Sequence, residues 1–250
     1  MKPVEYQTMY NQESEHWWFA GKRHMVHMLL KRHKIVDKVV ANKLRILDVG
    51  CGTGRNIQEL SQYGEVVGCD FSSDALIFCR KRGLNALVQA SAEALPFSGE
   101  EFDVICLLDV LYHRGIASDE QVIAQVYQAL RNGGALIITD SAFQFLFGHH
   151  DRAAHGLRRY ERQELKDKLL RAGFQVEQCG YANFLIFFPA FLIRMIKNRL
   201  PHTPDVTDIS PVHPWINTLF KNILSLEHWF MNFSPLPFGL SVFAVARKKK

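Results

Sequence analysis

The sequence predicts an α/β fold with a Rossmann-like, mostly parallel sheet of seven strands and an antiparallel hairpin at one edge. Apolar runs of strand length alternate with amphipathic stretches through residues 43–180. The first of these runs leads directly into a glycine-rich turn. A last apolar run, residues 241–246, is expected to pair antiparallel with the run at 174–179. A fold of this kind binds its ligand at the carboxyl ends of the central strands.

The chain begins with residues 1–42, which we predict to be a helical and amphipathic cap. Trp17 and Trp18 present a large apolar surface there, and Lys22 and Arg23 follow one turn later. Two interpretations are open. The cap either closes a ligand crevice from above or packs on the sheet with a basic face in solvent.

The next element is an apolar strand at 44–49 that runs into glycines at positions 50, 52 and 54, with a helix expected from Arg55. Glycine permits positive φ and leaves no Cβ between the backbone and a bound molecule. Backbone N–H groups and the start of the helix then face the ligand. The spacing G-x-G-x-G after Asp48 differs from the G-x-G-x-x-G of dinucleotide sites, which argues against a dehydrogenase.

The second strand, residues 65–70, is an apolar run that ends in Asp70. A carboxylate at that position is placed to accept both ribose hydroxyls of a nucleoside lying across the glycine turn. The alternative is that Asp70 caps a helix at 72–80. Further strands are predicted at 102–108, with Asp109 at the end, and at 135–139, after a helix end and a glycine turn.

With Asp48, the glycine spacing and Asp70, the chain resembles class I S-adenosylmethionine (SAM)-dependent methyltransferases. The resemblance covers nearly the whole chain and implies SAM as cofactor, with S-adenosylhomocysteine as product. The family's usual acid is missing at Ser91, so an adenine contact there is expected to be weaker or made by the backbone. Lys22 and Arg23 are expected near the SAM carboxylate. The resemblance implies cofactor contacts from Asp48, Gly50, Cys51, Gly52, Gly54, Asp70, Phe71, Ser91, Ala92, Glu93, Asp109, Trp18 and Arg23.

Two strings resemble a bacterial subset of this family, with the pattern E-x-H-W-W-F near the N-terminus and H-D, H and R-R-Y later. The resemblance implies a methyltransferase fold for this subset and no particular substrate. The chain matches the patterns at Glu15, His16, Trp17, Trp18, Phe19, His150, Asp151, His155, Arg159 and Tyr160.

The segment after residue 139 concentrates titratable side chains beside the expected crevice, which suggests an acceptor-binding surface. We expect His150 or His155 to act as a general base, with Asp151 as its orienting partner. His113 follows the strand that leads to Asp109, and its alternative role is helix capping. The candidate catalytic residues are His113, His150, Asp151, His155 and Tyr160.

Two other interpretations of this segment are open. In the first, Asp151 pairs with Arg158 or Arg159 in a purely structural network. In the second, the segment binds a metal; we predict no metal, because adjacent histidines in an extended loop point to opposite faces. The ligands of such a site would be His149, His150, Asp151 and His155.

Residues 181–240 are predicted to form an apolar helical cap, because about sixty residues are too many for a hairpin loop. Residues 184–193 carry no charge and precede Arg194, Lys197 and Arg199. This run is too short to span a bilayer of about 30 Å. It is therefore a buried helix, a lid over a lipophilic acceptor or an interfacial anchor. A small, lipophilic or lipid-linked acceptor is the favoured substrate class.

The composition suits one large domain, with 250 residues of which 48% are hydrophobic. Five cysteines without a C-x-x-C pair, and no expected signal peptide, predict a cytoplasmic protein, with peripheral membrane contact as an option. The net charge of +5 and the lack of a basic stripe argue against a nucleic-acid partner. The sequence leaves the oligomeric state open. The competing function is a SAM-binding module without turnover.

Overall fold

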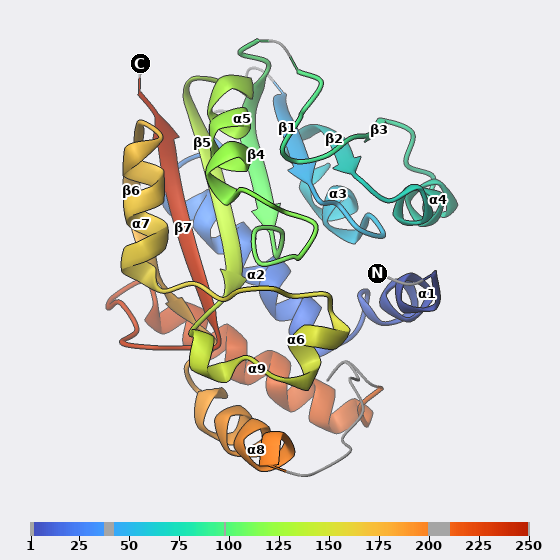
Figure 1. The fold of residues 1–250 in the computed structure, drawn as a ribbon, viewed down its shortest axis with the longest axis vertical. Helices are drawn as coiled ribbons and strands as arrows, with labels where there is room; N and C mark the ends of the chain where they lie inside the picture. The colour runs from blue at the N-terminus through green and yellow to red at the C-terminus, as the bar shows by residue number, and fades with distance from the viewer. Residues whose placement is uncertain (1–2, 38–42, 98, 200–210, 250) are drawn as a thin grey trace.

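The computed structural model describes residues 3–37, 43–97, 99–199 and 211–249. The strands of this part of the chain form one sheet (Figure 1). In chain order they are β1 (Leu44–Val49), β2 (Gly64–Asp70), β3 (Leu87–Gln89), β4 (Phe102–Leu108), β5 (Leu130–Ser141), β6 (Phe174–Ala182) and β7 (Ser241–Lys248). Across the sheet the order is β3-β2-β1-β4-β5-β7-β6.

Strands β1 to β5 pair in parallel, whereas β7 is antiparallel to both of its neighbours, β5 and β6. The central parallel strands are apolar throughout because helices cover both of their faces. The seven-stranded sheet with its antiparallel edge confirms the predicted fold class. One detail differs: residues 131–134 lie inside β5 as a bulge, because Phe102 pairs with Leu130 while Val104 already pairs with Ala135.

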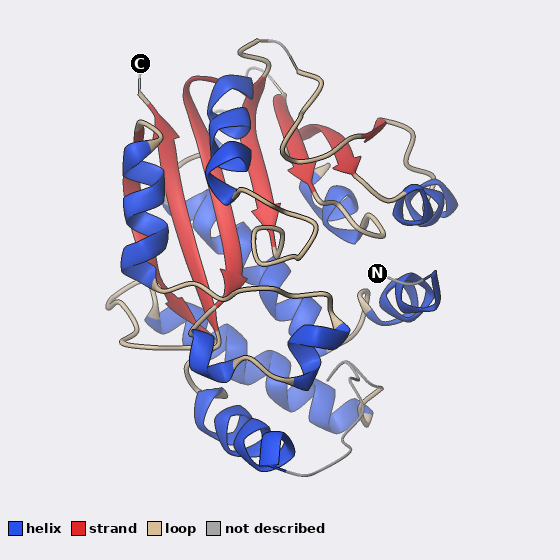
Figure 2. Ribbon diagram, viewed as in Figure 1, coloured by secondary structure: helices blue, strands red, loops and turns tan. Residues whose placement is uncertain are grey.

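Helices lie on both faces of the sheet (Figure 2). One face is covered by α5 (Asp119–Ala129) and α7 (Arg162–Arg171), which enclose the larger apolar cluster of the core. The other face is covered by α2 (Trp17–Arg32), α3 (Arg55–Leu60) and α4 (Ser73–Lys81), which enclose a second cluster. The sheet is therefore doubly wound, and its ligand crevice lies at the edge where the strands end.

The remaining helices lie around that edge. α1 (Pro3–Gln12) packs on α4, and the short α6 (His149–Ala153) follows β5 after a 3-10 turn. α8 (Phe187–Arg199) and α9 (Pro214–Phe230) fill the predicted second cap and lie together at the lower end of the sheet in Figure 1. Within the described residues, the search for a helix that is both long and apolar enough to cross a bilayer finds none.

Helix α9 lies along α2 at close range. The two helices approach closely at Gly21 of α2, where an added Cβ would lie 2.3 Å from Cδ1 of Leu224. The second cap is thus joined to the first one, and both border the same end of the sheet.

Candidate active site

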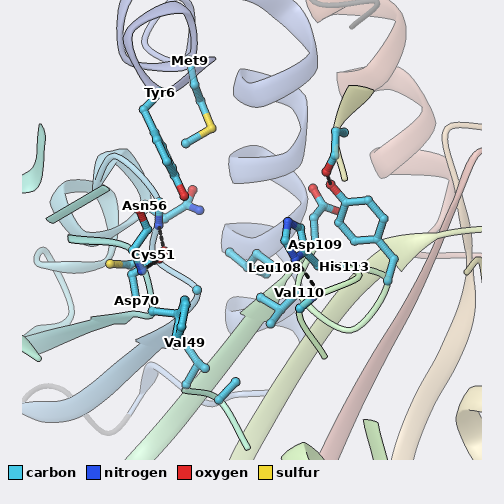
Figure 3. A pocket seen from close by; sticks show the side chains of 18 of the residues that line it. Tyr6, Met9, Val49, Cys51, Asn56, Asp70, Leu108, Asp109, Val110 and His113 are labelled. Atoms are coloured by element: carbon cyan, nitrogen blue, oxygen red, sulfur yellow. Dashed lines mark hydrogen bonds between the residues drawn. The ribbon is translucent and has the colours of Figure 1, made fainter. Parts of the chain in front are cut away.

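A pocket of about 900 Å³ opens at the carboxyl ends of β1 and β4. The chain leaves β1 toward β2 on one side, while β4 lies on the other, so this is the switch point at which open α/β sheets bind ligands. Figure 3 shows its two walls: the turn after β1 with Cys51 and Asp70, and the segment after β4 with Asp109 and His113. Tyr6 and Met9 of α1 point down toward the first wall. We call the side with Cys51 and Asp70 the cofactor end, and the side that runs from Asp109 to His113 the acceptor end.

The cofactor end is a backbone cradle that only glycine allows. Gly50 and Gly52 have φ of +71° and +55°. A Cβ on Gly50 would lie 2.6 Å from Cγ2 of Val110, and one on Gly52 would lie 2.7 Å from Cε of Met9. Any side chain would therefore strain the backbone and collide with Val110 or Met9, two residues that line the pocket.

Asp70, at the end of β2, holds this cradle in place. Its Oδ2 accepts a hydrogen bond from the backbone N–H of Gly52 at 2.9 Å, and its Oδ1 accepts one from Ser72 at 2.9 Å. Burial raises the pKa of Asp70. Ser72 rather than Asp70 is the N-cap of α4, since its side chain accepts from the N–H of Ala75. The helix-capping role that the sequence offered for Asp70 therefore belongs to Ser72.

Most residues expected to contact the cofactor line this pocket, and three do not. Asp48 is buried behind the turn, where burial and the nearby charges of Asp70 and Glu13 raise its pKa to about 8. Gly54 starts α3, and Glu93 accepts from the N–H of Ser118 at 2.7 Å, ahead of α5. The residues that do line the pocket are Trp18, Arg23, Gly50, Cys51, Gly52, Asp70, Phe71, Ser91, Ala92 and Asp109.

The two cations of the first cap have different partners. The guanidinium of Arg23 donates to the carbonyl oxygens of Glu13 and Ser14, at 2.5 and 3.0 Å, and so anchors the loop between α1 and α2. Lys22 instead pairs with Oδ2 of Asp109 and lies 4.8 Å from the ring centre of Trp18. Two N–H groups of Arg23 are thus used by this loop, and the expected contact of both cations with one carboxylate of the ligand stays a prediction.

Asp109 lies at the middle of the pocket with a φ of 59°. Of the described buried side-chain atoms, its Oδ1 and the Oγ1 of Thr139 are among those without a hydrogen-bond partner. A buried polar atom without a partner is rare and marks a place where a ligand can supply one. The glycine cradle, Asp70 and this free acceptor together fit a ligand that carries a nucleoside and an ammonium group.

The acceptor end contains Tyr112, His113 and His150. Burial raises the pKa of Tyr112, so its hydroxyl stays protonated. Burial lowers the pKa of His113 to about 4, so the ring is neutral at neutral pH. The N–H of Gly115 donates to Nδ1 of His113 at 3.0 Å, which places the ring hydrogen on Nε2. His113 is therefore a hydrogen-bond donor at Nε2 and not a base there.

The segment after β5 serves mainly as a framework. Asp151 and Arg159 are buried and form an ion pair at 2.7 Å, and Asp151 also accepts from the N–H of Gly148. The phenol of Tyr160 is fully buried and donates to Asp119 at 2.8 Å. Asp151 thus pairs with Arg159, as the structural-network interpretation predicts, and Tyr160 is not among the residues that line the pocket.

The histidines of this segment have separate positions. His149 and His150 lie in the first turn of α6, not in an extended loop as the metal argument assumed. His150 lines the pocket, whereas Nε2 of His155 lies 3.3 Å from the carboxylate of Glu5 and links this segment to α1. Among the described residues, no group of three or more His, Cys, Asp or Glu side chains is arranged to hold a metal.

Residues of α1 and its loop were not expected in the site. Tyr6 and Met9 line the cofactor end, and Glu13 is buried against Arg82, with which it pairs at 2.6 Å. Glu13 also accepts from the hydroxyl of Thr53 in the glycine turn. No local pattern indicates that α1 lies over the turn, because its position depends on these distant partners.

The comparisons with known proteins agree with this geometry. Residues 47–138 match the family model described as a methyltransferase domain, a range that contains the glycine turn, Asp70 and Asp109. The ubiquinone/menaquinone biosynthesis C-methyltransferase UbiE of Marinomonas sp. is 31% identical over 126 residues. That alignment covers 46% of this chain and 49% of the relative, so the chain spans about half the length of the curated relatives it matches.

Solved structures share the fold over a longer range. A SAM-dependent methyltransferase of Thermotoga maritima, described as a possible histamine N-methyltransferase, has a TM-score of 0.59 at 19% identity, with 98% of this chain and 96% of that chain covered. The (4+2)-cyclase SpnF has a TM-score of 0.54 at 19% identity, with 88% and 80% covered. At this level of identity these likenesses show the fold alone.

Proposed function

We propose that this chain is a SAM-dependent methyltransferase that acts on a small acceptor. The observation that carries the proposal is the cofactor end of the pocket, where the cradle at Gly50 and Gly52 adjoins the buried carboxylate of Asp70. The partnerless Oδ1 of Asp109 fits the ammonium group of the cofactor's amino-acid part. The family match over residues 47–138 supports the same cofactor.

When bound, SAM supplies an electrophilic methyl group on a sulfonium leaving group. The protein then has to orient the acceptor and exclude water, an effect worth about 7 to 11 kcal/mol in favourable cases. Tyr6 and Met9 cover the cofactor end, and Trp18 lines the middle of the pocket. His150 is the candidate base for an acceptor that must lose a proton, a role worth roughly 10²- to 10⁴-fold in rate.

The acceptor is proposed to be lipophilic or lipid-linked. Support comes from the apolar second cap and from the relative whose name describes C-methylation in quinone biosynthesis. For a carbon acceptor next to a hydroxyl or oxo group, the Nε2–H of His113 is suited to donate to that oxygen, which carries negative charge after the acceptor has lost its proton and before the methyl group is transferred. A cytoplasmic location and membership of the subset with the E-x-H-W-W-F pattern are parts of the same proposal.

Calorimetric titration tests the cofactor directly. We expect SAM and S-adenosylhomocysteine to bind and NAD not to bind, because the turn lacks the third glycine of a pyrophosphate site. Binding of NAD without SAM contradicts the proposal. Transfer of tritium from methyl-labelled SAM to fractions of a cell extract, lipid fractions included, then identifies the acceptor.

A second candidate function is a module that binds SAM without turnover. It is compatible with the shared fold, because a fold does not fix a reaction, as the cyclase name of SpnF illustrates. The two functions differ in one measurement. Retained SAM binding with no label transfer to any fraction supports the second candidate.

A further inference from the structure

Helix α9 exposes a mostly apolar row on the side that faces away from the protein. Its members follow one another in alternating steps of four and three residues, the spacing by which one helix contacts another. At 3.6 residues per turn, those within the helix lie within about 80° of one another. Phe233 continues the row beyond the helix, because its ring lies 4.8 Å from that of Trp229 between ring centres. We call this row the outer stripe, and it consists of Trp215, Leu219, Asn222, Leu226, Trp229 and Phe233.

The outer stripe is large enough for a specific contact. Its apolar members are exposed, with fractions from 48% at Leu219 to 71% at Phe233. Each of the three aromatic members exposes more than half of a side chain that offers about 150–250 Å² of surface. Pairing of two such stripes would bury on the order of 1,000 Å² over both chains, which reaches the lower limit for a specific interface. Soluble proteins rarely expose an apolar patch of this size unless it binds something.

The opposite side of α9 carries the polar contacts with the rest of the protein. Glu227 is buried and accepts from the N–H groups of Asn183 and Leu185, at 2.5 and 2.8 Å. His228 is buried beside His24 of α2, with 3.1 Å between their Nδ1 atoms. These hydrogen bonds fix the inner side of α9 on the protein, while the outer stripe faces outward.

Asn217 joins α9 to the start of α2 as well. Its Oδ1 accepts from the N–H of Trp17 at 2.7 Å, and its Nδ2 donates to the carbonyl of Glu15 at 2.8 Å. The ring of Trp17 stacks on Phe220 at 4.8 Å between ring centres, next to Trp18 in the pocket. The helix that carries the outer stripe is therefore held in place by the first cap.

The outer stripe carries no charge. The structure describes every residue of α9, and the exposed positions of this helix hold only uncharged residues. Lys221 lies off the stripe and pairs with Glu15 at 3.3 Å, and Glu227 and His228 are buried. Such a row can face its own copy without bringing like charges together. A helix that lies in a membrane interface instead has Lys and Arg on its polar face, which in α9 is turned toward the protein.

We propose that the outer stripe is the contact surface between two copies of this chain, related by a two-fold axis that passes close to Asn222. The same residues then lie on both sides of the contact, as in most homodimers. Asn222 is the one polar member of the row and lies near its middle. A single asparagine in an apolar helix seam selects the register and the number of helices. The pairing does not depend on methyl transfer, so its failure would leave the proposed function untouched.

Sedimentation velocity with the full chain tests the proposal. We expect a dimer at micromolar concentration. Trp215→Ser together with Trp229→Ser removes four indole rings from a two-fold contact and is expected to raise the dissociation constant roughly tenfold or more. The matched control is Leu170→Ser on α7, an exposed apolar residue outside the stripe, which is expected to sediment like the unaltered protein.

A pair of charged variants tests the symmetry of the contact. Asn222 is exposed, so Asn222→Asp and Asn222→Lys are expected to keep the fold. Each variant alone places like charges close to the two-fold axis and is expected to dissociate into monomers. An equimolar mixture brings opposite charges together and is expected to restore the dimer. A change in folding alone does not produce this rescue.

Separate outcomes overturn the proposal. A protein that stays monomeric at every concentration at which it is soluble excludes the contact. A dimer that neither the double substitution nor the charged variants weaken uses another surface. A monomer that floats with vesicles of phosphatidylglycerol and phosphatidylcholine, and no longer does so after the double substitution, assigns the outer stripe to a lipid surface. Retained thermal stability of the variants ensures that these comparisons report on the surface and not on folding.

Discussion

The two ends of the pocket are built from different parts of the chain. The cofactor end is mainly backbone: a glycine turn after β1 held by Asp70 from the next strand. The acceptor end consists of side chains, such as His113 after β4 and His150 in α6. Backbone geometry follows from a few neighbouring residues, whereas the side-chain end depends on contacts between distant segments. The first end is therefore suited to a constant ligand and the second to a variable one.

The largest expected effect concerns the framework of the acceptor end. Asp151→Ala removes the partner of buried Arg159 and is expected to lower the free energy of unfolding by about 3 to 5 kcal/mol. Urea denaturation measures it. Asp167→Ala on α7 removes the same charge from a less buried site and serves as the control. If Asp151→Ala keeps full stability but loses turnover, Asp151 is catalytic. It would then not be part of a structural framework behind the acceptor end.

The next effect concerns Asp48 behind the cofactor end. Asp48 ionises near pH 4 in the unfolded chain but only at about pH 8 in the folded protein. The folded state keeps the proton that the unfolded state loses, so stability is lost as the pH rises from about 4 to about 8. Asp48→Asn should remove this loss and raise the free energy of unfolding by about 4 kcal/mol at neutral pH.

Denaturation at about pH 5 and about pH 8 checks this prediction, with Asp74→Asn on α4 as the control for a lost charge outside the core. The free energies of unfolding of Asp48→Asn and of the unaltered protein are then compared. If they differ by the same amount at both pH values, Asp48 is already ionised in the folded state.

A smaller effect is expected from the carboxylate that adjoins the cradle. Asp70→Ala removes the acceptor for Gly52 and the proposed acceptor for the ribose hydroxyls of SAM, with an expected loss of about 1.5 to 3 kcal/mol, or about 10- to 150-fold in Kd. Calorimetric titration measures the affinity, and Asp74→Ala is the matched control. An unchanged Kd would limit Asp70 to positioning the start of α4.

The smallest effect is expected where the two ends meet. His155→Ala breaks the partly exposed contact with Glu5 and loosens α1, a change of about 0.2 to 1 kcal/mol that speeds SAM dissociation no more than about fivefold. Stopped-flow fluorescence or mixing experiments measure the rate of SAM dissociation. Glu5→Gln removes the charge of the other partner in this contact and should change that rate by the same amount. A loss of turnover by a hundredfold or more, with SAM release unchanged, would instead make His155 a general base.

The sequence was sufficient for the fold and for the expectation that the glycine turn and Asp70 lie together at one side of a pocket. The glycine turn and Asp70 lie within two consecutive strands, where strand, turn and helix geometry fixes their relation. The same reasoning failed for Asp48, since a strand pattern does not show which side chain points away from the crevice. The contacts of bound SAM remain predictions.

The acceptor end was not predictable in the same way. The cover of the cofactor end was not predictable either, because Lys22 reaches Asp109 across 87 positions of the chain and α1 lies over the glycine turn through Glu13 and Arg82. Which partner Asp151 takes depends on which groups are buried together, and a cluster of titratable residues in the sequence does not contain that information. The motif led us to expect catalytic roles for Asp151 and Tyr160, whereas the structure pairs them with Arg159 and Asp119 and places His150 of the same segment in the pocket.

The cap that Asn217 provides for α2 has a consequence for synthesis on the ribosome. Asn217 follows Trp17 by 200 positions, and the nascent chain emerges from its N-terminus onward. The N–H of Trp17 in the first turn of α2 therefore lacks this hydrogen-bond acceptor until α9 has been translated. Chains released before that point carry the glycine turn but lack the support for Trp18 and Lys22. Ligand binding to a complete pocket is thus delayed until the two caps have met.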